Sequence, residues 1–412
     1  MRPPGMRYIS TRGMAPRVDF EGALFSGYAP DGGLFMPEEL PQLSIETLRQ
    51  WSTLSYPGLV KELCTLFIGP ELIPRDVLNG LIDQAFSRFR HREVVHLSRL
   101  RNGLNVLELW HGVTYAFKDL SLCCTAQFLQ YFLEKKEKHV TVVVGTSGDT
   151  GSAAIESVQG AKNMDIIVLL PKGHCTKIQE LQMTTVLREN VHVFGAGCLA
   201  QKMGLPVRLV VAVNRNDIIH RTVQQGDFSL SEAVEQTLAS AMDIQVPYNM
   251  ERIFWLLSGS NSQVTRALME QFERTHSVSL PKELHSKLSG AVTSESVSDE
   301  AITQTMARCW EENKYLLCPH SAVAVSYHYQ QTEQQPPSLP RCCLAPASAA
   351  KFPEAVLAAG LTPETPAEIL ALESKGTRCT PMRKGDDWTL MLRNTIEDIS
   401  CQQRGHFLNA LE

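Results

Sequence analysis

Hydrophobic and polar positions along the middle of the chain follow two alternating periods, and this alternation predicts the fold. Short runs of β-branched and apolar residues are separated by longer segments with apolar residues at helical spacing. The expected strands are residues 104–110, 139–144, 165–170, 191–194 and 207–213, and the expected helices are residues 119–138, 152–162 and 178–190. Strands that alternate with such helices indicate right-handed βαβ units around a buried parallel sheet, so the predicted fold class is α/β.

The segments on either side of this region have a less regular pattern. Before it, Ala29-Pro30-Asp31-Gly32-Gly33 is a turn signal, and residues 44–51 and 56–67 have helical spacing. After it, most segments have helical spacing, and capping boxes are expected at residues 229–232 and 296–299. Residues 342–344 lead into a helix that is expected to begin near Ala350. The pattern therefore predicts an α/β protein with an added N-terminal segment.

Composition narrows the possible functions. A formal net charge of -5 over 412 residues offers no basic surface for nucleic acid. No apolar run approaches the ~20 residues that cross a bilayer, and the N-terminus lacks the apolar core of a secretory signal. The 11 cysteines include no C-x-x-C pair and no Cys/His spacing of a zinc site. We therefore expect reduced thiols, no metal and a cytoplasmic location.

One lysine lies where a strand and a loop lead into a helix, in Ala116-Phe117-Lys118-Asp119. The helix dipole and the apolar Phe117 both disfavour an ammonium group at this position. Because a Schiff base with an aldehyde requires a neutral amine, Lys118 is a candidate catalytic residue. The alternative is a solvated lysine, which is common at helix starts.

A glycine-rich turn, Gly145-Thr146-Ser147-Gly148-Asp149-Thr150-Gly151, follows the strand that ends at Val144. Such a strand-to-helix turn offers converging N–H groups and hydroxyls, which suit a carboxylate or a phosphate. It is not a P-loop, because no Gly-Lys-Ser/Thr follows. The alternative is a tight turn in which Asp149 or Thr150 caps the next helix.

A second glycine turn, Gly195-Ala196-Gly197-Cys198-Leu199-Ala200, matches the G-x-G-x-x-A dinucleotide fingerprint. The acidic residue expected ~20 positions further on is replaced by Asn214-Arg215-Asn216, which argues against a nicotinamide site. His111 and His320 lie beside turns and are interpreted as structural histidines.

Several short runs occur along nearly the whole chain in an order that one known family shares. The most distinctive are Glu108-Leu109-Trp110-His111-Gly112, Ala116-Phe117-Lys118-Asp119, Thr146-Ser147-Gly148-Asp149-Thr150-Gly151 and Ala350-Lys351-Phe352-Pro353-Glu354. Further runs lie at residues 8–13, 29–38, 241–244, 249–252 and 319–323. Together they resemble the threonine synthase family, whose members are pyridoxal-phosphate enzymes of fold type II.

This resemblance implies the architecture and the cofactor. The fold would be that of the tryptophan synthase beta-like enzymes, with parallel sheets flanked by helices. A threonine synthase N-terminal domain would span residues 1–95, and a two-lobed catalytic region would span residues 96–412. The cofactor would be pyridoxal 5'-phosphate, bound by Lys118 as a Schiff base.

The resemblance also implies roles for individual residues. Lys118 would take the Cα proton of the substrate, and Asp149 would lie near the phenolic oxygen of the cofactor. Ser348 would supply the hydroxyl that faces the pyridine nitrogen, from a position displaced along this loop relative to the family's own hydroxyl. The substrate carboxylate would be bound by Thr146, Ser147, Gly148 and Thr150.

The runs are most similar to those of a vertebrate threonine synthase-like branch, which implies a reaction. That branch acts as a phospho-lyase on O-phosphothreonine and O-phosphohomoserine, giving 2-oxobutyrate, ammonia and phosphate. The implied partners are a small phosphorylated amino acid and, by analogy with the fold type, a second copy of the chain.

One departure from the family leaves a second function open. The family has an Asn-Ser-x-Asn-x-x-Arg segment for the substrate phosphate and a Pro-[ST]-Gly-x-x-Gly-[ND] loop for the cofactor phosphate. This chain has neither, because only residues 195–198 lie between Phe194 and Leu199. The pattern indicates an internal deletion near residues 195–199 that removes a helix and a central strand. The alternative is therefore a catalytically impaired isoform that acts through protein contacts.

Overall fold

The structure is a computed structural model that describes residues 5–146, 148–170, 175–188, 190, 208–334, 340–380 and 387–409, the last seven of these by their backbone alone. The N-terminal segment contains a two-stranded antiparallel sheet, in which β1 (Tyr8–Ser10) pairs with β2 (Phe35–Pro37). The expected turn before β2 is confirmed, with Gly32 at φ 78°, a conformation that favours glycine.

Four helices belong to this N-terminal segment: α1 (Phe20–Leu24), α2 (Ile45–Trp51), α3 (Tyr56–Phe67) and α4 (Arg75–Phe86). The side chains of Ser44 and Ser55 accept hydrogen bonds from backbone N–H groups in the first turns of α2 and α3. Such caps satisfy donors that a helix leaves unpaired at its start, so the two helices expected here are confirmed.

Three pairs of parallel strands form the centre of the remaining chain. β4 (Leu104–Glu108) pairs with β11 (Arg341–Ala345), β5 (Val140–Gly145) pairs with β6 (Met164–Leu169), and β7 (Leu209–Val213) pairs with β10 (Val292–Ser296). Two antiparallel pairs complete the described strands: β3 (His96–Arg99) with β4, and β8 (Asp227–Ser229) with β9 (Ser277–Ser279). The parallel pairing is confirmed, although it is divided among separate sheets.

Helices cover these strands, as the sequence predicts. They are α5 (Lys118–Lys136), α6 (Asp149–Val158), α7 (Lys177–Thr184), α8 (Ile218–Gln225), α9 (Met250–Leu257), α10 (Ser262–Thr275), α11 (Lys282–Ala291), α12 (Asp299–Asn313), α13 (Pro319–Gln334), α14 (Pro353–Ala358), α15 (Ala367–Leu370) and α16 (Trp388–Asn409). Short 3₁₀ helices are η1 (Arg101–Gly103), η3 (Ser240–Met242), η4 (Ala349–Lys351) and η5 (Ala371–Ser374). Within the described part of the chain, no helix has the length and apolar character needed to span a membrane.

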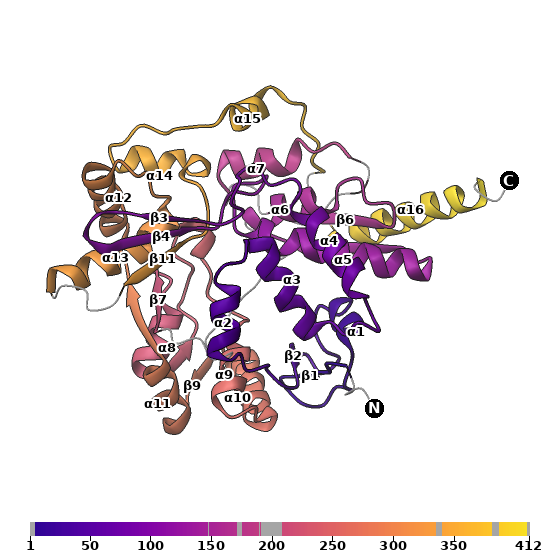
Figure 1. Cartoon of the computed structure of the whole chain (residues 1–412), viewed down its shortest axis with the longest axis horizontal. Helices are drawn as coiled ribbons and strands as arrows, with labels where there is room; N and C mark the ends of the chain where they lie inside the picture. Colours follow the sequence, from indigo (N-terminus) through magenta and orange to yellow (C-terminus); the bar gives the residue numbers. More distant parts are fainter. Residues whose placement is uncertain are drawn as a thin grey trace.

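Two hydrophobic cores define the lobes between which the site lies. One joins β4 and β11 to α12, α13 and α14, and the other joins β5 and β6 to α5 and α6. In Figure 1 the first group lies on the left and the second on the right. The chain passes from the first to the second between Glu108, at the end of β4, and Lys118, at the start of α5.

Some boundaries expected from the sequence are wrong. The expected capping box at residues 229–232 starts no helix, because Ser229 ends β8 and pairs with Ser277 of β9. α12 is capped by Ser298 rather than Ser296, which belongs to β10. α7 ends at Thr184, well before Asn190, whose side chain instead donates hydrogen bonds to three backbone carbonyls after α6 and at the start of β6. The strand expected at residues 191–194 lies outside the described residues.

Candidate active site

Three loops meet where parallel strands reach their carboxyl ends. β4 leads to Lys118, β11 leads to Ser348, and β5 leads to Asp149 at the start of α6. The first two loops pair through an isolated bridge between Ala116 and Ala347. Ligands of open α/β sheets bind at such edges, so the topology brings the predicted site residues to a suitable place.

Lys118 is the first residue of α5 and is partly buried. Its Nζ lies 4.7 Å from the centroid of the Phe117 ring. Burial lowers the pKa of Lys118, and the opposing charge of Asp149 does not fully offset this effect. The predicted position at a helix start beside an apolar ring is confirmed, and burial shifts Lys118 toward its neutral form relative to an exposed lysine.

Asp149 is buried at the first position of α6. Its Oδ1 lies 2.7 Å from Nζ of Lys351 and accepts a hydrogen bond of 2.9 Å from Nε2 of Gln179. Burial alone would raise the pKa of Asp149, but the charge and hydrogen bond of Lys351 hold this pKa below its usual range. The site therefore contains an ionised carboxylate with a fixed partner.

Lys351 has no role in the sequence-based prediction, although it belongs to one of the matching runs. It ends η4, its side chain is 0% exposed, and its Nζ also donates a 2.8 Å hydrogen bond to the backbone carbonyl of Thr114. Fully buried lysines are rare unless they are paired. The sequence signal was a lysine placed directly between the apolar residues Ala350 and Phe352.

The glycine-rich turn is held together by Thr146. Its Oγ1 accepts hydrogen bonds from the N–H groups of Gly148 (3.1 Å) and Gly151 (3.0 Å). Gly148 has φ 142°, and a Cβ there would lie 2.6 Å from the side chain of Gln179. Gly148, not Asp149 or Thr150, is the N-cap of α6, without a side-chain cap. Carboxylate binding by this turn stays a prediction, and Ser147 lies outside the described residues.

Ser348 lies beside the loop that precedes Lys118, because its N–H donates to the carbonyl of Tyr115 (3.1 Å). Its Oγ accepts from the N–H of Ala350 and so caps η4. The hydroxyl proton is not used in that bond, and Ser348 is only partly buried. Its role toward a pyridine nitrogen stays a prediction.

The two histidines differ in their hydrogen bonding. His111 Nε2 lies 2.7 Å from Oε2 of Glu108, as expected of a structural histidine. His320 Nε2 accepts from the N–H of Ala241 (3.0 Å), whereas its buried Nδ1 has no partner among the described residues. Burial lowers the pKa of His320 to about 4, so its ring is neutral at pH 7. The purely structural interpretation of His320 is therefore incomplete.

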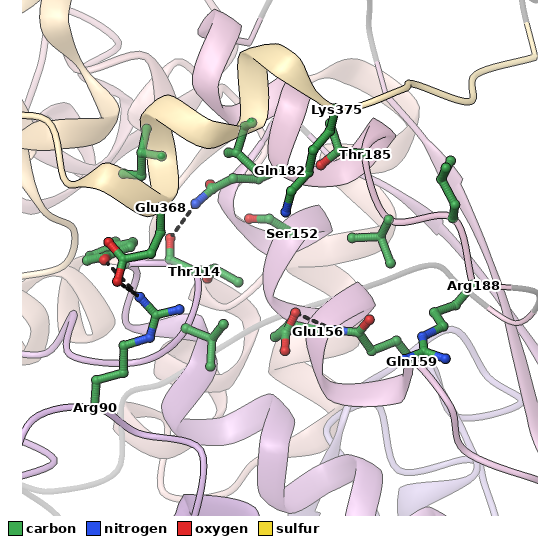
Figure 2. Close-up of a pocket in the computed structure, with 16 residues that line it drawn as sticks. Arg90, Thr114, Ser152, Glu156, Gln159, Gln182, Thr185, Arg188, Glu368 and Lys375 are labelled. Carbon is green, nitrogen blue, oxygen red and sulfur yellow. Dashed lines mark hydrogen bonds and ion pairs between the residues drawn. The ribbon is translucent and has the colours of Figure 1, made fainter.

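A cavity of about 520 Å³ lies beside these groups. Thr114 and Ser152 line it, but Lys118, Asp149 and Lys351 do not. Figure 2 shows its polar lining, including the hydrogen bond from Gln182 to the carbonyl of Thr114. The side chains of Lys118, Asp149 and Lys351 therefore lie next to this cavity without lining it. The second glycine turn, at residues 195–200, lies outside the described residues.

Comparison with known proteins identifies relatives across nearly the whole chain. Residues 7–86 match the family model "Threonine synthase N terminus", and residues 321–391 match "Threonine synthase, C-terminal". Threonine synthase-like 2 of Homo sapiens is 73% identical over 481 aligned positions, covering 98% of this chain and 99% of that protein. Threonine synthase of Saccharomyces cerevisiae is 32% identical and covers 85% of this chain and 88% of that protein. Because 481 aligned positions exceed the 412 residues of this chain, the human protein contains segments without a counterpart here.

Solved structures match the fold closely. The crystal structure of PLP-bound threonine synthase from Brucella melitensis has a TM-score of 0.85 and 29% identity, covering 92% of this chain and 96% of that chain. The yeast threonine synthase structure has a TM-score of 0.87 and 29% identity, covering 96% and 99%. The fold is thus that of the fold-type-II PLP-dependent enzymes. With these relatives, the chain belongs to the threonine synthase family.

Proposed function

We propose that the chain is a PLP-dependent phospho-lyase that acts on O-phosphothreonine and O-phosphohomoserine. The products would be 2-oxobutyrate, ammonia and phosphate, with one water consumed. The observation that carries this proposal is Lys118, a partly buried amine at the start of α5 whose pKa is lowered by burial. Such an amine suits covalent attachment of an aldehyde.

The described residues fit the aldehyde and ring of pyridoxal phosphate. Lys118 offers the amine, and Ser348 offers a hydroxyl from the loop that pairs with the Lys118 loop. His320 Nδ1 is a buried polar atom without a partner among the described residues, which a bound molecule would satisfy. Residues 195–199, where the family's cofactor-phosphate loop is expected to be deleted, lie outside the described residues.

The residues of this chain would act through proton transfer and orientation. The cofactor supplies an electron sink for charge that develops at Cα. Lys118 would take the Cα proton, and for a phosphate on Cγ it would also take a proton from Cβ after it has released the first proton to water. The Thr146–Thr150 turn would hold the substrate carboxylate at the start of α6. Asp149 stays ionised beside Lys118 because Lys351 neutralises it.

The test combines attachment of the cofactor with turnover. We expect the purified chain, reduced with borohydride in the presence of pyridoxal phosphate, to carry the adduct on Lys118 in peptide mapping. Lys118→Ala should abolish both the adduct and the release of 2-oxobutyrate and phosphate from O-phosphothreonine. Lys177→Ala is the matched control, since Lys177 also begins a helix but is exposed. A folded chain that forms no adduct would contradict the proposal.

A second candidate function is supported by apolar side chains exposed on parallel strands. Val143 of β5, Val210 of β7 and Leu344 of β11 are 42%, 41% and 55% exposed. Strands of parallel sheets are normally buried on both faces, whereas no described element covers these three positions. This observation, with the shorter length relative to the human protein, favours a catalytically impaired isoform that acts through protein contacts. It predicts a folded chain without an adduct at Lys118.

Three further properties are proposed for the chain, whichever of the two functions it has. The chain would act in the cytoplasm, it would form a homodimer, and its N-terminal domain would end near residue 95. Light scattering at micromolar concentration tests the dimer, and limited proteolysis near residue 95 tests the boundary.

A further inference from the structure

Lys351 lies at the centre of a closed set of contacts between three elements. Its Nζ pairs with Asp149 of α6, and its backbone carbonyl accepts a 3.0 Å hydrogen bond from Oγ1 of Thr176, the N-cap of α7. Gln179 completes the set, because its Oε1 accepts from the N–H of Thr176 and its Nε2 donates to Asp149. The ammonium group of Lys351 is therefore fixed in place, not merely enclosed.

Two lysines lie near one buried carboxylate. The charge of Asp149 acts on Lys118, yet its hydrogen bonds go to Lys351 and Gln179. Two other titratable groups among the described residues, Asp119 and His320, do not act as a charge partner of Lys118. Asp119 accepts two hydrogen bonds from Thr114, and the buried His320 is neutral at pH 7.

We propose that Lys351 is a positioning residue that occupies Asp149 as its internal counter-ion and thereby leaves Lys118 available as a free amine. The inference rests on the proposed function only in taking Lys118 as the reactive amine. A buried carboxylate without a partner is costly, and the nearest cation relieves that cost. Without Lys351, the uncompensated charge of Asp149 raises the pKa of Lys118 and shifts this amine toward its protonated form.

The contacts also explain why a lysine occupies position 351. An ammonium group carries three protons on a compact head, so Nζ reaches Oδ1 of Asp149 and the carbonyl of Thr114 at once. The Thr114 carbonyl belongs to the loop that leads to Lys118. Lys351 therefore links the charge of Asp149 to the backbone that positions Lys118.

The test measures the reactivity of Lys118 without any cofactor. Trace reductive methylation with formaldehyde and cyanoborohydride is followed from pH 6 to pH 10, and each lysine is quantified by peptide mass spectrometry. In Lys351→Met, we expect the midpoint of the Lys118 profile to move up by at least about one pH unit, which slows labelling at pH 7 about tenfold. The profile of the exposed Lys177 should not move. In the double variant Lys351→Met/Asp149→Asn, the Lys118 profile should return to that of wild type, because no unpaired carboxylate remains.

A folded Lys351→Met chain with an unchanged Lys118 profile would overturn the proposal. If this variant fails to fold, the pH profiles of Lys118 labelling in wild type and in the double variant are compared instead. Equal Lys118 profiles support the proposal, whereas a more reactive Lys118 in the double variant shows that Asp149 is the counter-ion of Lys118 in wild type and overturns it. Failure of the proposed function is distinguishable, since a chain that binds no pyridoxal phosphate still yields these profiles.

Discussion

Glu251 of α9 binds two polar side chains of the N-terminal segment, and its replacement tests how much this contact contributes to the attachment of that segment. Its carboxylate accepts hydrogen bonds from Oγ1 of Thr11 (2.6 Å) and from the guanidinium of Arg12 (3.2 Å). The side chains of Arg12 and Glu251 are 7% and 4% exposed. Arg12 also pairs with Glu273, which is 56% exposed. We expect Glu251→Gln to loosen β1 and β2 from the rest of the protein.

The magnitude follows from what the substitution leaves behind. Removing one partner of a buried ion pair costs about 3–5 kcal/mol, because the other charge stays buried. Arg12 keeps Glu273 as a partner, and the amide that replaces the carboxylate keeps one acceptor oxygen, so about 3 kcal/mol is expected. Since each 1.4 kcal/mol is a factor of ten, amide exchange in β1 through local opening should become about 100-fold faster. Glu273→Gln removes only an exposed carboxylate and should change this rate by about fivefold or less.

Hydrogen exchange read by mass spectrometry is the appropriate assay. A chain of this size with two lobes is not expected to unfold in one step, so a global melting temperature would mix several events. Peptides that contain β1 and β2 report the local opening, and peptides from α12 serve as an internal reference. Equal exchange in Glu251→Gln and Glu273→Gln would refute the assignment of the buried pair as the anchor.

Three further substitutions test the fold and the site. Burial would raise the pKa of Glu108, but hydrogen bonds led by His111 lower it to about 2 from 4.5. This group therefore stabilises the folded state above pH 4.5, and the contribution is lost as the pH falls through 2. Glu108→Gln should lose about 3 kcal/mol at pH 7 and converge with wild type near pH 2, as measured by hydrogen exchange in peptides from β3 and β4. Phe132→Ala should cost about 3–5 kcal/mol by exchange in peptides from α5 at neutral pH, because Phe132 is fully buried between α5 and the N-terminal helices. Gly148→Ala should cost about 2 kcal/mol, because φ 142° strains alanine. Wild-type stability of Phe132→Ala or of Gly148→Ala would contradict the burial or the strain on which the prediction rests.

Local patterns in the sequence were sufficient to predict several parts of the fold. Lys118 begins α5 as expected, because the strand before it and the helix after it both have clear periodicity. The helices expected at residues 44–51 and 56–67 and the turn at Gly32 likewise depend on neighbouring residues alone. The error at Ser229 has the same origin, since a capping pattern cannot reveal that the serine pairs with a distant strand.

The ion pair between Lys351 and Asp149 could not be predicted in this way. The two residues are far apart in sequence, and they meet only because β5 and β11 end at the same place. No periodic pattern indicates which carboxylate a buried lysine will face. A lysine within an apolar run signals that a partner exists, because an unpaired buried charge is too costly. The identity of that partner depends on the pairing of strands, which hydrophobic pattern alone does not determine.

The exposed apolar residues on the parallel strands bear on both the fold and the function of the chain. Val143, Val210 and Leu344 have the character of buried parallel strands, and the sequence predicts them to be covered. Their exposure is what the loss of a helix and a central strand near residues 195–199 would produce. The same loss would remove the residues that hold the two phosphates, while the loops that carry Lys118, Asp149 and Lys351 come from strands that are present. The amine chemistry can therefore survive where phosphate binding does not, and only the separate measurement of Lys118 reactivity and of cofactor attachment distinguishes the two.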